Sequence, residues 1–167
     1  MKGETNKMTV KELKQFFKDI RKEQEEIQQI KNLIQQKELN LLPRGITYDK
    51  DKVQVSPDDK FSEVCAAISD LEIELGQSIM ILAKKQIQAE QLIRKLEDAN
   101  ERKVMRYYYL TMFDGQLPTW VQVGIRMNYY EAYVKKLHGR ALLNLAKIQQ
   151  GDSEQKAGHG RISGRGK

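Results

Sequence analysis

Residues 120–145 read WVQVGIRMNYYEAYVKKLHGRALLNL, and this stretch decides the expected fold of the C-terminal part. A helix-turn-helix needs a small residue where its two helices cross and a residue that tolerates positive φ in the turn. Gly124 and Asn128 stand at these two positions. The apolar positions of the motif are also filled, by Val123, Met127, Tyr129, Val134 and Leu137. The spacing predicts a helix-turn-helix from about Trp120 to Leu142.

The second helix of this unit has one face that suits the major groove of DNA. With Tyr133 at its border, this face carries Ala132, Lys135, Lys136, Gly139 and Arg140. The small residues would let the helix backbone approach the bases, while Lys136 and Arg140 could reach guanine edges or phosphates. We expect Lys135 to meet a phosphate and Glu131 to accept a hydrogen bond from a cytosine amine. The alternative is a solvated basic face with no ligand.

Further DNA contacts are expected at the start of the unit and in its turn. Arg126 and the backbone amides near Thr119 and Trp120 would hold the sugar–phosphate backbone. Tyr130, at the start of the second helix, completes the predicted DNA-binding set.

The basic residues are concentrated at the C-terminal end. Residues 101–167 hold 12 Lys or Arg against 5 Asp or Glu, whereas residues 61–100 hold 4 against 7. The whole chain has a formal net charge of +6. A concentrated positive field suits a polyanion such as nucleic acid.

The N-terminal part follows a seven-residue repeat that predicts a coiled-coil helix from Thr9 to about Glu38. Its first set of seam residues is spaced by seven: Leu13, Ile20, Ile27 and Ile34. Phe16 and Ile30 occupy the second set, which Glu23 interrupts. Thr9 and Glu12 have the spacing of a capping box at the helix start.

A break at residues 39–60 separates this helix from a second one. The break contains Pro43 and Gly45, and its residues 46–55 could form a short β-hairpin. Ser56 and Pro57 are a strong start for the second helix, which we expect to reach Glu97. Its seam is Phe61, Val64, Ile68, Leu71, Leu75, Ser78, Leu82, Lys85, Ala89, Leu92 and Leu96. Residues 8–97 are therefore predicted to form an antiparallel two-helix coiled coil.

More apolar residues lie on the second helix than one partner helix would cover. They are Ile73, Ile79, Met80, Ile87 and Ile93. They indicate a homo-oligomer, a dimer or a tetramer; alternatively, the C-terminal helices cover this face. Cys65, beside the seam, is expected to be a small buried residue.

A third short helix is expected from Glu101 to about Met112, followed by a turn at residues 113–118. This helix belongs to an expected DNA-binding domain of residues 98–149. Since all the main expected elements are helices, the expected fold class is all-α. The glycine-rich, basic residues 150–167 are expected to be a disordered tail.

The motifs resemble those of a known family, the small phage-encoded regulators of late genes (the ArpU-like and RinA-like group). The C-terminal half of these regulators is similar to the promoter-reading region of bacterial sigma factors. The matching motifs are Arg106-Tyr107, Thr119-Trp120, Val123-Gly124 and the LHGRAL of residues 137–142. The departures are Val121, Gln122 and Tyr130, where the family has two acidic residues and a capping serine. The resemblance implies a sequence-specific DNA-binding transcriptional regulator of phage or prophage genes that oligomerises through its coiled coil.

Other classes of protein are less well supported. With two histidines, His138 and His159, and one cysteine, neither a zinc site nor a Cys–His nucleophile is expected, so we predict no enzyme, metal or cofactor. His138 is expected to pack between helices or to contact a phosphate. No apolar run is long enough for a membrane span, and a bacterial cytoplasm is the expected location.

Two alternative functions stay open. One is a small terminase subunit, which also combines a helix-turn-helix with oligomerisation and recognises phage DNA for packaging. The other is a coiled-coil protein that binds host machinery such as RNA polymerase, in which the helix-turn-helix serves only for packing.

Overall fold

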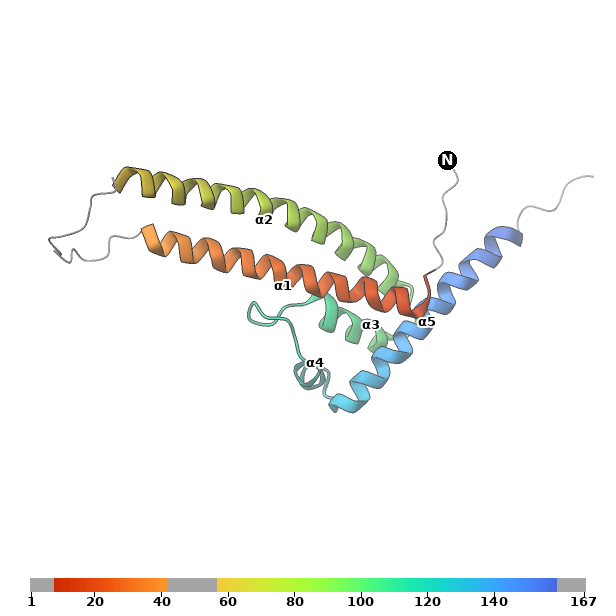
Figure 1. The fold of residues 1–167 in the computed structure, drawn as a ribbon. Coiled ribbons are helices and arrows are strands. Elements are labelled where there is room, and N and C mark those ends of the chain that lie inside the picture. Colours follow the sequence, from red (N-terminus) through yellow and green to blue (C-terminus); the bar gives the residue numbers. More distant parts are fainter. Residues whose placement is uncertain (1–7, 42–56, 159–167) are drawn as a thin grey trace, which may run out of the picture. The chain divides into compact units, whose positions relative to one another are not determined.

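The computed structural model describes residues 8–41 and 57–158, and within these ranges the protein is helical (Figure 1). In chain order, the elements are α1 (Val10–Leu41), α2 (Pro57–Arg94), α3 (Ala99–Met105), the π-helical η1 (Arg106–Leu110), α4 (Trp120–Met127) and α5 (Glu131–Gly158). The predicted all-α class is confirmed. Among the described residues, no helix has both the length and the apolar character needed to cross a membrane.

The helices extend further into the central break than expected. α1 continues to Leu41 and α2 begins at Pro57, so both ends of the predicted 39–60 loop are helical. The predicted β-hairpin of residues 46–55 and the capping Ser56 lie outside the described residues. At the N-terminal end, the Thr9–Glu12 capping box is confirmed: Thr9 N donates to Glu12 Oε2 at 2.7 Å, and Glu12 N donates to Thr9 Oγ1 at 3.3 Å.

The seam of α1 follows the heptad, with one shift. Its first set is buried as predicted: Leu13, Ile20, Ile27 and Ile34. In the second set, Phe17 and Gln24 are buried, whereas the predicted Phe16 and Glu23 are only half-buried. Positions one residue apart in a helix lie about 100° apart, so the buried stripe is rotated toward the Phe17 side.

The seam of α2 is the one that the sequence predicts, apart from its first residue. The positions from Val64 to Leu92 are buried or half-buried, whereas Phe61 is exposed. Cys65 is also exposed, so the prediction that it is buried is wrong. It lies on the outer side of α2 because its neighbour Val64 occupies the shielded position.

α2 ends at Arg94, earlier than the predicted Glu97, and α3 starts at Ala99 rather than at Glu101. The cause is Asp98, whose side chain accepts hydrogen bonds from the backbone N–H groups of Asn100 and Glu101. An aspartate in this position satisfies amides that otherwise have no partner at a helix start.

The described residues divide into two compact units. Unit 1 comprises residues 8–21 and 85–158, and unit 2 comprises residues 22–84. The sequence predicted a division at residue 97 instead, between a coiled coil and a C-terminal domain. The difference arises because both ends of the predicted coiled coil, at residues 8–21 and 85–97, belong to the same unit as the C-terminal helices.

The core of unit 1 is assembled from all its segments. Fully buried side chains come from α1 (Leu13, Phe17, Ile20), from the end of α2 and the turn after it (Ala89, Ile93, Leu96), and from α3 to α5 (Val104, Met105, Val123, Val134, Ala141, Leu145). α3 and α4 both pack on α5. The rings of Phe17 and Tyr109 lie 4.9 Å apart and join α1 to η1.

α5 is longer than expected. The helix continues to Gly158, so the predicted tail, which was to start at Gln150, begins inside a helix. Residues 150–157 contain a single glycine and no proline, so their composition does not interrupt a helix. The rest of the predicted tail, residues 159–167, lies outside the described residues.

Candidate nucleic-acid interface

The corner between α4 and α5 is fixed at both ends of α4 by its own residues. At the start, Thr119 and Gln122 form a reciprocal capping box, in which Thr119 N donates to Gln122 Oε1 at 2.8 Å. At the end, Asn128 adopts the left-handed conformation, with φ 56° and ψ 41°, as the sequence predicted. Tyr129 N then donates to the carbonyl of Gly124 at 2.9 Å and closes the turn.

Gly124 allows the two helices to approach each other. A Cβ atom at this position would lie 2.7 Å from the carbonyl oxygen of Tyr129, which is closer than a real Cβ can come. Val123, Val134 and Leu137 are buried at the crossing as predicted. Tyr129, which fills an apolar position of the predicted motif, is 38% exposed and rests edge-on against Tyr133. The α4–α5 corner therefore has the small residue, the turn residue and most of the core that the motif requires.

Trp120 belongs to an aromatic stack that anchors the start of α4. Its indole lies parallel to the Tyr108 ring, at 3.6 Å and 10°. The guanidinium of Arg21 lies 4.0 Å over the same tyrosine ring and donates hydrogen bonds to the carbonyls of Tyr108 and Pro118. The indole of Trp120 therefore has a packing role, while the DNA contact expected from the backbone amides near Thr119 and Trp120 stays a prediction. The role of Arg21 was missed, since its partners lie far away in the sequence.

The π-helical turn η1 places Tyr108 and Tyr109 at this stack. Arg106, its first residue, forms an ion pair with Glu90 of α2 at 2.6 Å, and this pairing lowers the pKa of the Glu90 carboxyl. The hydroxyl of Thr111 donates to the carbonyl of Arg106 at the end of the turn. The widened turn buries Tyr109 and turns Tyr108 toward Trp120.

His138 packs inside unit 1 and does not face a ligand. Its Nε2 lies 2.8 Å from the hydroxyl of the buried Tyr109, and its ring also touches Tyr108 and Trp120. Burial, together with the nearby charge of Lys14, lowers the pKa of His138 to about 4. Of the two roles expected from the sequence, this geometry supports helix packing.

The outward face of α5 is exposed where the sequence predicts it. Ala132, Lys135, Lys136 and Gly139 are all exposed, and a Cβ at Gly139 would meet no atom within 4 Å. Lys135 forms an ion pair with Glu131 at 2.5 Å, so each of these two side chains already has a partner. The same face continues to the exposed Leu143. Because Leu143 lies seven residues after Lys136, helical periodicity could have placed it on this face.

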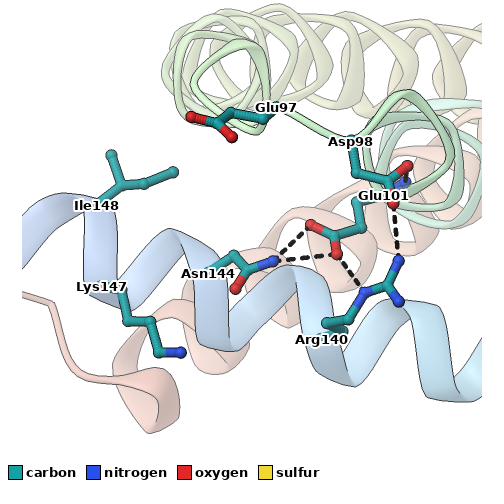
Figure 2. A pocket seen from close by; sticks show the side chains of 7 residues that line it. All are labelled: Glu97, Asp98, Glu101, Arg140, Asn144, Lys147 and Ile148. Atoms are coloured by element: carbon teal, nitrogen blue, oxygen red, sulfur yellow. Dashed lines mark hydrogen bonds and ion pairs between the residues drawn. The ribbon is translucent and has the colours of Figure 1, made fainter.

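Arg140 does not belong to this outward face. Figure 2 shows its guanidinium turned toward the start of α3, where Nε pairs with Glu101 and Nη2 with Asp98. The buried Glu101 also accepts two hydrogen bonds from the side-chain amide of Asn144. The predicted contact of Arg140 with guanine edges or phosphates stays a prediction; in the structure its charge balances the buried carboxylate of Glu101, because it lies on the edge of α5 that faces α3.

An open hollow of about 560 Å³ surrounds this cluster (Figure 2). It is lined by Glu97, Asp98, Glu101, Arg140, Asn144, Lys147 and Ile148. Its central charges are paired with one another, and Asn100 N–H holds the pKa of the Asp98 carboxyl below its usual range. We therefore assign the hollow to the packing of α3 on α5.

Two predicted contact residues lie at the tip of the corner. The guanidinium of Arg126 rests 4.4 Å over the Phe113 ring, although the side chain stays exposed. Tyr130 is 91% exposed. The outer side of α4 also presents two exposed apolar residues, Val121 and Ile125, which the predicted site did not include.

Within residues 8–41 and 57–158, no group of three or more His, Cys, Asp or Glu side chains could hold a metal ion. Comparison with models of known protein families, with curated proteins and with solved structures finds no match for this chain. The likeness to phage late-gene regulators therefore remains an expectation from sequence motifs.

Proposed function

We propose that the protein is a sequence-specific DNA-binding transcriptional regulator of phage or prophage late genes, and that it acts as an oligomer. In this proposal α4 and α5 form a helix-turn-helix, with α5 as the recognition helix. The observation that carries it is the combination of the tight α4–α5 corner with an exposed, basic face at the start of α5.

This face has the shape that entry into a major groove requires. Ala132 and Gly139 are small and lie on either side of Lys136, so the backbone of α5 could come close to the base edges. Lys136 is the side chain best placed to reach guanine. Lys135 would exchange its partner Glu131 for a phosphate, and the first amides of α4, beside Thr119, would bind another.

The proposed biological role is drawn from the sequence motifs. The Thr119-Trp120 start and the LHGRAL of residues 137–142 resemble late-gene regulators of phages. The structure gives most of that string a packing role, since Leu137, His138, Ala141 and Leu142 are buried and Arg140 is ion-paired. Base recognition is therefore assigned to the exposed residues of α5 that lie between and beside these buried or ion-paired positions.

A matched pair of lysine variants tests the proposal. Bound DNA would first be selected from a random pool, and affinity for the selected site would then be measured by fluorescence anisotropy at several salt concentrations. We expect Lys136→Ala to weaken binding roughly 5- to 150-fold, the cost of about 1–3 kcal/mol for one lost base contact. Lys103→Ala removes an equally exposed lysine from α3 and should change affinity little.

The salt dependence separates two kinds of contact. If Lys136 meets a phosphate, its removal should reduce the slope of log affinity against log salt by about 1. If it meets a base, the slope should stay unchanged while discrimination at one position is lost. Equal effects of Lys136→Ala and Lys103→Ala, or no selected sequence at all, would contradict the proposal.

A second candidate function is the binding of a protein such as RNA polymerase by the same corner. The exposed apolar residues Val121 and Ile125, together with Tyr130, which is 91% exposed, favour it. Aromatic and aliphatic side chains of this kind are typical of protein contact sites. Ile125→Lys would abolish copurification with polymerase and leave DNA affinity intact if this second function is the correct one.

A further inference from the structure

α2 carries a second apolar stripe that its predicted seam does not use. Within unit 2 the stripe consists of Ala66, Ser69, Ile73, Gly76, Met80 and Ala83, whose positions alternate in steps of three and four. All six are exposed, and Ile73 and Met80 are 59% and 64% exposed. Such a spacing keeps one face of a helix turned toward a partner helix over several turns. A helix that exposes it in water is expected to bury it by association.

The stripe alternates large and small residues in a regular order. Ile73 and Met80 are seven residues apart, and the small Ser69, Gly76 and Ala83 fall between and beside them, also seven apart. At Gly76, a Cβ would meet no atom within 4 Å among the described residues. No contact in the described part of the chain therefore requires a glycine here, although glycine costs about 1 kcal/mol in a helix relative to alanine.

We propose that this stripe pairs with the same stripe of a second copy of the chain, with the two α2 helices antiparallel. In an antiparallel pair the large positions of one helix face the small positions of the other. Two registers do this, and the charges beside the stripe select one of them: Ile73 packs on Ala83 of the partner subunit, and Met80 packs on Gly76 of the partner subunit. Gly76 is then required because it makes room for the Met80 side chain.

The charges beside the stripe agree with this register. Asp70 flanks one end and Lys84 the other end on the same side, so the antiparallel pairing brings Asp70 within two residues of the position opposite Lys84 of the partner subunit. The two-fold axis passes near Gln77, and the partly exposed Ile79 meets its own counterpart on the other flank. A parallel pairing would set Gly76 against Gly76, leave a gap there, and bring no opposite charges together.

This inference deepens the oligomeric part of the proposed function and rests on it, but it does not require DNA binding. It states the face, the direction and the register of the association. Its test therefore uses the full chain without DNA, so that failure to dimerise and failure to bind DNA are observed separately.

Cysteine crosslinking tests the direction of the pair. Cys65 is first replaced by serine, and a single cysteine is introduced as Gln77→Cys or as Ile73→Cys. Under mild oxidation, the antiparallel register predicts a disulfide-linked dimer for Gln77→Cys, because this residue lies near the axis. It predicts almost none for Ile73→Cys, whose two copies are several turns apart. The reverse result would overturn the proposal, as would a monomer in sedimentation equilibrium.

A second variant separates dimerisation from folding. At Gly76 an added Cβ meets no atom within 4 Å in the described chain, and leucine has a higher helix propensity than glycine, so Gly76→Leu should retain its helix content. In the dimer the added side chain collides with Met80, and we expect dimerisation to weaken by on the order of tenfold or more. Asp70→Lys should also weaken the dimer, and Asp70→Lys combined with Lys84→Asp should restore it. Unchanged dimerisation in Gly76→Leu would overturn the register.

Discussion

At the scale of single residues, the burial of His138 connects proton binding to folding. An unfolded chain binds a proton at this histidine near its ordinary pKa of 6.5, whereas the folded protein binds it only near pH 4. Between these values the unfolded state holds more protons than the folded state. Stability must therefore fall as the pH is lowered from about 7 to about 4, and the contribution amounts to at most about 3 kcal/mol.

We predict that His138→Gln removes this part of the pH dependence. The glutamine amide can still accept a hydrogen bond from the Tyr109 hydroxyl, but it does not titrate. Urea unfolding at pH 7 and at pH 4.5 measures the free energy of unfolding of both proteins. The wild type should lose more stability than the variant over this interval. The same loss in both would mean that His138 is not buried in its neutral form.

Two glycines on neighbouring helices make opposite predictions. Gly124→Ala places a methyl group against the carbonyl of Tyr129 and should destabilise the protein by about 1–3 kcal/mol. Gly139→Ala faces open space within a helix and should stabilise it by about 0.5–1 kcal/mol. Thermal unfolding followed by circular dichroism measures both. A tolerated alanine at Gly124 would contradict the close helix crossing.

At the scale of elements, Arg21 links three segments of unit 1. It donates to the carbonyls of Tyr108 and Pro118 and covers the Tyr108 ring, which in turn stacks on Trp120. Arg21→Met keeps the aliphatic stem but removes these interactions, and we expect a loss of about 1–3 kcal/mol. Trp120 is the single tryptophan, so its fluorescence reports on the stack directly.

The neighbouring lysine provides the control for Arg21. Lys22 forms only an exposed ion pair with Glu26, one turn further along α1. Lys22→Met should therefore change the unfolding free energy by less than about 1 kcal/mol and leave the Trp120 emission unchanged. If Arg21→Met behaves like this control, the stack does not anchor the start of α4.

The elements that the sequence predicts well are those with local causes. The heptad residues of α2, the Thr9–Glu12 capping box and the positive φ of Asn128 all depend on neighbours a few residues away. The π-helical turn η1 was not predicted, because its five residues are too short a stretch for the wider i→i+5 spacing to show in the apolar pattern. Its contacts, such as the ion pair of Arg106 with Glu90, join residues from separate helices.

In the candidate interface, too, contacts between separate helices could not be predicted from the sequence. The helical periodicity of α5 placed Lys136 and Arg140 on one outward face, and the exposure of Lys136 agrees with it. Arg140 lies at the edge of that face, and only the packing of α3 brings Glu101 and Asp98 within its reach. No pattern in the sequence connects positions so far apart, so its role could not be predicted.

At the scale of the whole molecule, the division into units changes what can fold alone. The sequence predicted an independent domain of residues 98–149. In the structure, unit 1 also requires residues 8–21 and 85–97, which contribute fully buried side chains such as Phe17 and Ile93. A fragment without them exposes the apolar faces of α3 and α5 to water.

We therefore predict that a fragment of residues 98–158 does not unfold cooperatively. Each buried aliphatic or aromatic side chain that is missing removes about 1.5–3 kcal/mol of hydrophobic stabilisation. The free energy of unfolding of a small domain is only about 5–15 kcal/mol. A single chain that joins residues 8–21 to residues 85–158 through a flexible Gly/Ser linker restores these side chains and should fold. Urea unfolding followed by Trp120 fluorescence compares the two. If the short fragment shows the same cooperative transition as the linked chain, the C-terminal domain folds without residues 8–21 and 85–97, and the prediction is wrong. If only the linked chain shows it, the α4–α5 corner depends on the start of α1 and on the end of α2.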